Sequence, residues 1–72
     1  MGYGSAIREN RKKLGLTQTE LAVKAGVSRA AIWLWESETA KPTNSRKLAA
    51  LENALKLNPG SLYSMIYSEA AI

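Results

Sequence analysis

The chain has 72 residues and a formal net charge of +4, and it contains neither cysteine nor histidine. Disulfides, Cys/His zinc sites and catalysis by cysteine or histidine are therefore excluded. All six acidic residues are glutamates, which leaves little for a carboxylate active site or a magnesium site. We expect no metal, no cofactor and no enzyme activity. The positive charge favours a polyanionic partner.

The spacing of apolar residues predicts an all-α fold of five helices without strands. The expected helices cover about 5–14, 18–25, 28–37, 45–56 and 59–68, all within one domain spanning residues 1–72. Asn58-Pro59 reads as a cap followed by proline at the first position of the last helix. No apolar run approaches the roughly 20 residues that span a bilayer. The first residues lack the apolar core of a signal peptide, so we expect a cytoplasmic protein.

The most informative segment runs from Thr17 to Glu36 and reads as two short helices joined by a tight turn. Thr17 and Glu20 have the spacing of a capping box, which starts a helix. Gly26 can supply the left-handed residue that ends this helix, and Ser28 can cap the next one. Two short helices at this separation are typical of a helix-turn-helix motif.

The helix expected over 28–37 has two unlike faces. Ser28, Ala31, Ile32 and Trp35 fall on one side of a helical wheel, and Arg29, Ala30, Trp33, Leu34 and Ser37 fall on the other. The first face suits a hydrophobic core. The second begins with Arg29, and arginine bonds guanine bidentately in the DNA major groove. An ordinary helical hairpin with a solvated outer face would show the same pattern.

The chain resembles the lambdoid repressor and Cro-type helix-turn-helix family, often called the XRE family, over about residues 5–67. The resemblance is carried by a joint pattern of matching residues: Ile7, Arg8, Arg11, Leu14–Gln18, Glu20–Ala22, Gly26–Ser28, Ile32, Trp35, Glu36, Pro42, Leu48, Leu51 and Leu55–Leu57. It implies a compact lambda repressor-like domain of a bacterial or phage transcriptional regulator. Such a protein is expected to bind double-stranded DNA at a palindromic operator as a homodimer and to act most often as a repressor.

The resemblance also implies roles for individual residues. Arg29, Ala30 and Leu34 occupy positions that read base edges, and the neighbouring Trp33 is added to them. Contacts to the DNA backbone are expected from Thr17, Gln18, Ser28, Lys41, Thr43, Asn44, Ser45 and Arg46. Arg11 and Glu36 correspond to a structural ion pair between the first and third helices. Candidates for a dimer interface are Leu57, Tyr63, Met65 and Tyr67, some of which must also close the core.

Two departures from the family pattern affect these expectations. Glu38 stands where glycine is usual, so we expect the loop before the fourth helix to turn differently. Trp33 and Leu34 place large apolar side chains on the outward face, which indicates a contact surface. That surface could pack on DNA or hold a protein. The alternative function is therefore a protein-interaction module, antitoxin-like or antirepressor-like, that uses Trp33 and Leu34.

Overall fold

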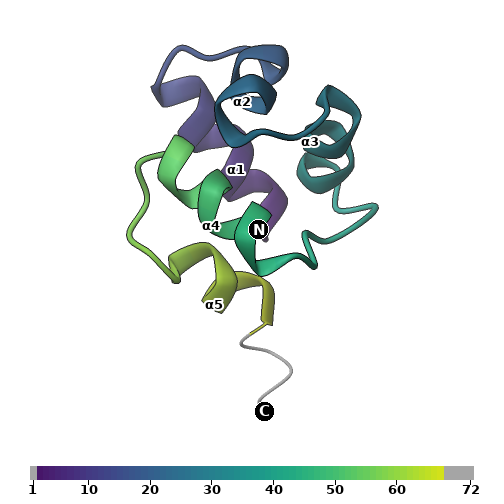
Figure 1. Ribbon diagram of the computed structural model, residues 1–72, viewed down its shortest axis with the longest axis vertical. Helices are drawn as coiled ribbons and strands as arrows, with labels where there is room; N and C mark the ends of the chain where they lie inside the picture. Colours follow the sequence, from purple (N-terminus) through teal and green to yellow (C-terminus); the bar gives the residue numbers. More distant parts are fainter. Residues whose placement is uncertain (1, 68–72) are drawn as a thin grey trace.

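The computed structural model describes residues 2–67, which form five helices and contain no strand. The helices are α1 (Tyr3–Lys13), α2 (Gln18–Ala25), α3 (Arg29–Glu36), α4 (Ser45–Ala54) and α5 (Ser61–Tyr67). Figure 1 shows α2 and α3 together at one end of the molecule, with α5 at the opposite end. The all-α architecture predicted from the sequence is confirmed.

Helix α2 has the predicted bounds, and α3 is shorter than the predicted 28–37 by one residue at each end, where Ser28 and Ser37 act as caps. The Thr17 hydroxyl accepts a hydrogen bond from the Glu20 N–H at 3.1 Å, and the Glu20 carboxylate accepts one from the Thr17 N–H at 2.8 Å. Gly26 has a φ of 71° and ends α2 in the left-handed conformation. The Ser28 hydroxyl accepts from the Ala31 N–H at 3.1 Å and starts α3. Each of these signals acts within one helical turn.

The outer two helices begin at other positions than predicted. The prediction started the first helix at residue 5, but α1 begins at Tyr3 because the Gly4 N–H has an acceptor in the distant Glu38 carboxylate, at 3.0 Å. The prediction started the last helix at Pro59, but α5 begins at Ser61 because Gly60 has a φ of 87°, which an α-helix cannot contain. Residue 68, the predicted end of that helix, lies outside the described residues.

The expectation of an altered turn after α3 is wrong. Glu38 adopts a φ of 61°, the left-handed region that favours glycine, although it carries a side chain. That side chain accepts the hydrogen bond from Gly4. A Cβ atom at Gly4 would collide with the Glu36 carbonyl oxygen, so glycine allows the start of α1 to approach the end of α3 closely. The loop therefore takes the glycine-like turn with a glutamate.

One hydrophobic core receives residues from all five helices. Its buried members are Ile7, Leu21, Ala22, Ala25, Ile32, Trp35, Leu48, Leu51, Leu55, Leu62 and Ile66. α2 packs against both α3 and α4, and α1 packs against α3 and α5. These contacts hold α3 on one side only and leave its opposite face free. No helix within the described part of the chain is long and apolar enough to cross a membrane.

A buried carboxylate attaches α5 to α4. Glu52 is only 5% exposed, and its oxygens accept hydrogen bonds from the backbone N–H groups of Gly60, Leu62 and Tyr63 at 3.0, 2.8 and 3.1 Å. These N–H groups belong to the first turn of α5 and the residue before it, where no carbonyl of the helix can serve them. Glu52 therefore satisfies the start of α5 from another helix.

Candidate nucleic-acid interface

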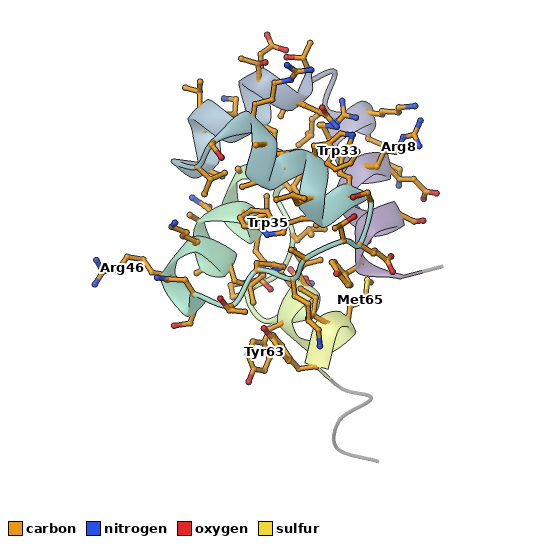
Figure 2. The ribbon with its side chains drawn as sticks, turned by 90° about the vertical axis from the view of Figure 1, so that its right-hand side faces the viewer. Arg8, Trp33, Trp35, Arg46, Tyr63 and Met65 are labelled. Atoms are coloured by element: carbon orange, nitrogen blue, oxygen red, sulfur yellow. The ribbon has the colours of Figure 1, made fainter. Side chains whose placement is uncertain are left out.

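The outward face of α3 is a mixed basic and aromatic surface. Ile32 is fully buried and Trp35 is 7% exposed, whereas Trp33 is 55% exposed. Arg29 and Ala30 are also exposed. In Figure 2, Trp35 lies in the body of the molecule and Trp33 lies near its edge. The helical wheel therefore placed these side chains correctly.

Leu34 was expected to be exposed on the outward face of α3, but its side chain is half-buried. The chain after α3 folds back onto the last turn of this helix. The carbonyl oxygen of Leu34 accepts hydrogen bonds from the N–H groups of Thr39 and Ala40 at 3.0 and 3.3 Å. Only part of the Leu34 side chain remains available for contact with another molecule.

Two hollows flank Trp33. One is lined by Arg29, Ala30 and Trp33. The other, of about 290 Å³, lies between α1, α2 and α3, and its lining residues are Arg8, Arg11, Gln18, Trp33, Glu36 and Ser37. Figure 2 shows Arg8 and Trp33 on the same side of the molecule. The sequence did not single out Arg8 as a site residue, although its i, i+3 spacing from Arg11 places both on neighbouring positions of one helix face.

A polar network forms the floor of the second hollow. Arg11 Nε lies 2.7 Å from Glu36 Oε2, and Arg11 Nη2 donates to Glu36 Oε1 at 3.2 Å. A third guanidinium nitrogen donates to the Leu16 carbonyl at 2.9 Å, and Gln18 Nε2 donates to Glu36 Oε1 at 3.1 Å. The side chains of Arg11 and Glu36 are 12% and 7% exposed. This network fixes α3 relative to α1 and α2.

Several side chains expected at the DNA backbone also cap helices. Thr17 and Ser28 accept hydrogen bonds at the starts of α2 and α3. Asn44 Oδ1 accepts from the N–H groups of Arg46 and Lys47 at 2.9 and 3.2 Å, at the start of α4. Each capping side chain still has a hydroxyl or amide hydrogen to donate. Capping and binding an anionic acceptor are therefore compatible in these residues.

The remaining expected backbone contacts lie near the start of α4. Lys41, Thr43, Ser45 and Arg46 are exposed. The Arg46 side chain extends away from the body of the molecule in Figure 2. Unlike the Arg46 side chain, the Lys41 ammonium contacts another side chain: it lies over the ring of Tyr67, 5.5 Å from the ring centroid.

The four candidates for a dimer surface divide into two pairs. Tyr63 and Met65 on α5 are 53% and 45% exposed, and Figure 2 shows both at the same end of the molecule. Leu57 and Tyr67 are partly buried against the core, and the Tyr67 hydroxyl donates to the Pro42 carbonyl at 2.8 Å. Leu57 and Tyr67 therefore serve the domain itself, which leaves Tyr63 and Met65 as the exposed part of this surface.

Two side chains in the described part of the chain, Glu20 and Tyr3, have a shifted pKa, and neither shift suggests catalysis. The pKa of Glu20 is lowered mainly by the hydrogen bond from the Thr17 backbone, with a further contribution from the Thr17 hydroxyl. The pKa of Tyr3 is raised by burial first, then by the charge of Glu38 and by Tyr67. Within residues 2–67, no group of acidic side chains is arranged to hold a metal ion.

Two short, capped helices at a tight turn, the second with one face in the core and an exposed face that begins with Arg29, define a helix-turn-helix protein. Residues 7–62 match the Helix-turn-helix family, and the chain belongs to it. Among solved structures it is similar to the P22 c2 repressor protein, crystallised in complex with synthetic operator 9T in the presence of Tl⁺. The two chains are 40% identical with a TM-score of 0.80, and the match covers 86% of this chain and 92% of that one. No curated protein matches this chain significantly.

Proposed function

We propose that this protein represses transcription by binding a palindromic DNA operator as a homodimer, with α3 in the major groove. The observation that supports this most strongly is that the two faces of α3 differ. One face is held in the domain through Ile32, Trp35 and Glu36, and the exposed face begins with Arg29. The similar P22 c2 repressor is a repressor bound to operator DNA. Helix-turn-helix proteins of this kind are DNA-binding regulators rather than enzymes, and double-stranded DNA is the partner.

Base selection is assigned to the outward face of α3. The Arg29 guanidinium would donate two hydrogen bonds to the O6 and N7 atoms of a guanine. Ala30 and Trp33, which line the hollow next to Arg29, would supply apolar contact to a thymine methyl group. Leu34 would contribute only the part of its side chain that is exposed.

Affinity that does not depend on base sequence is assigned to groups around α3. Thr17 and Gln18 lie at the start of α2, and Ser28 caps the start of α3 itself. Lys41, Thr43, Asn44, Ser45 and Arg46 lie before and within the start of α4. We add Arg8, because it shares the second hollow with Trp33 and Gln18. Contacts of these groups to phosphates would make binding sensitive to salt.

The proposed two-fold dimer follows from the small number of base pairs that one domain can contact. One short recognition helix reaches few base pairs, and two-fold dimers of helix-turn-helix proteins read half-sites about one helical turn apart. We assign the dimer contact to Tyr63 and Met65, since Leu57 and Tyr67 pack against the core of their own domain. Residues 1–72 would act as one DNA-binding domain in the cytoplasm of a bacterial or phage-infected cell, at the nucleoid.

Selection of bound duplexes from a randomised pool, at near-physiological salt, tests the proposal. We expect the unaltered protein to recover a palindrome with a guanine in each half-site. Arg29→Ala should lose preference at that guanine, at a cost of about 1–3 kcal/mol for each half-site, while preference at other positions remains. Lys24→Ala removes an equal charge from the last turn of α2 and serves as the control. An unchanged motif for Arg29→Ala would remove Arg29 from the groove.

The exposure of Trp33 favours a second candidate, an antitoxin-like or antirepressor-like module that binds a protein. An indole that is 55% exposed can anchor a protein interface, where tryptophan is enriched at the residues that contribute most to binding. Trp33→Ala distinguishes the two roles. Operator affinity should fall if the indole packs on DNA, and it should stay unchanged if the indole anchors a protein partner.

A further inference from the structure

We propose that Tyr67, at the end of the described part of α5, positions Lys41 for contact with a DNA phosphate. The segment concerned is the α3–α4 loop, residues 37–44. The inference rests on the proposed function, because it assumes that this loop meets the DNA backbone. It adds a positioning residue from α5, a helix remote in sequence from the loop that it contacts.

The α3–α4 loop is fastened by the two ends of the described chain. The Tyr3 hydroxyl donates to the Ala40 carbonyl at 3.1 Å, and the Tyr67 hydroxyl donates to the Pro42 carbonyl at 2.8 Å. The Pro42 side chain is itself fully buried. Two carbonyl groups on either side of Lys41 thus receive hydrogen bonds from helices remote in sequence. The backbone at Lys41 is therefore held in one place.

The aromatic ring of Tyr67 acts on the Lys41 side chain itself. A lysine side chain in solvent occupies many rotamers, and binding a phosphate requires most of them to be given up. The Lys41 ammonium lies over the Tyr67 ring, 5.5 Å from its centroid, where the negative face of the ring attracts a cation. Tyr63 lies against that ring, with the centroids 4.8 Å apart. The ring therefore restricts Lys41 before DNA arrives.

Lys41 remains free to bind DNA in this arrangement. Its side chain is exposed, and one face of a ring leaves part of the ammonium open to solvent. The acidic residue of the same loop, Glu38, directs its carboxylate to the Gly4 N–H instead. Arg46 and Lys47 follow at the exposed start of α4. Lys41 thus belongs to a positive edge that can approach a polyanion.

The test measures operator affinity against salt concentration, over about 50 to 200 mM, for Lys41→Ala, Tyr67→Leu and the double variant. The operator is the duplex selected by the unaltered protein. Loss of one phosphate contact lowers the slope of log K against log salt by about 0.9. We expect that loss for Lys41→Ala, a partial loss of slope for Tyr67→Leu because the lysine charge remains, and no loss beyond that of Lys41→Ala for the double variant. Tyr67→Phe keeps the ring but loses the hydroxyl that bonds to Pro42, so its slope shows how much of the positioning comes from the ring alone.

The controls separate positioning from general stability and from the proposed function. Lys24→Ala should keep the slope although it removes the same charge. Thermal unfolding checks each variant, and Tyr67→Met, which has a flexible side chain without a ring, replaces Tyr67→Leu if the latter does not fold. An unchanged slope in a folded Tyr67→Leu or Tyr67→Met variant, or additive losses in the double variant, would overturn this inference alone. Salt-insensitive binding by the unaltered protein would overturn the proposed function as well.

Discussion

At the scale of single residues, the Arg11–Glu36 pair is the interaction whose loss should cost most. Both side chains are nearly buried, so removing the guanidinium leaves the Glu36 carboxylate without its cation. Arg11→Ala should lower the free energy of unfolding by about 3–5 kcal/mol. Urea unfolding followed by circular dichroism measures this, and the exposed neighbour Lys12, changed to alanine, should give a shift within about 0.5 kcal/mol. Equal midpoints for the two variants would contradict the structural role of Arg11.

Two residues in the left-handed conformation should respond differently to replacement by glycine. Lys56 has a φ of 58° after α4, and Glu38 has a φ of 61° after α3. Lys56→Gly should raise stability by about 1 kcal/mol, because glycine adopts this conformation without a Cβ clash. Glu38→Gly gains the same relief but loses the carboxylate that accepts from Gly4, a bond of about 1.5–3 kcal/mol. Stability should therefore fall or stay level; a gain equal to that of Lys56→Gly in matched urea titrations would show that the bond contributes nothing.

At the scale of elements, α5 depends on a side chain that lies outside it. Glu52→Gln keeps the size of the side chain but replaces one accepting oxygen by an amide group and removes the charge near a helix N-terminus. We expect a loss of about 2 kcal/mol and faster hydrogen exchange at the amides of Leu62 and Tyr63. Glu9→Gln, at an exposed position of α1, is the control. Unaltered exchange in α5 would show that packing of Leu62 and Ile66 alone holds this helix.

The elements also show which signals a sequence pattern carries. The capping box at Thr17, the end at Gly26 and the cap at Ser28 join groups within four residues of one another, so the helix-turn-helix could be predicted. The start of α1 depends on Glu38, 34 residues away from Gly4. Such a contact forms only when the fold brings α1 to the end of α3. The local periodicity of the sequence therefore could not predict it.

At the scale of the whole molecule, contacts between distant parts of the chain explain where the helical wheel predicted the exposure of a side chain wrongly. Periodicity separated the two faces of α3, and it correctly left Arg29 and Trp33 exposed. It could not foresee that the α3–α4 loop would fold back beside Leu34, or that Tyr67 would bond to Pro42. A 72-residue chain has little interior, so side chains at its ends also complete distant parts of the structure.

The two tryptophans lie two positions apart in the sequence and in unlike surroundings, Trp35 at 7% exposure and Trp33 at 55%. An indole among apolar groups fluoresces at shorter wavelength than one in water, and a dissolved iodide ion quenches only an indole that it can reach. We therefore expect the emission of this protein to have a blue component from Trp35 in the core and a quenchable red component from Trp33 on the outer face of α3. One unlabelled sample can report unfolding and events at the outer face of α3 as separate optical signals.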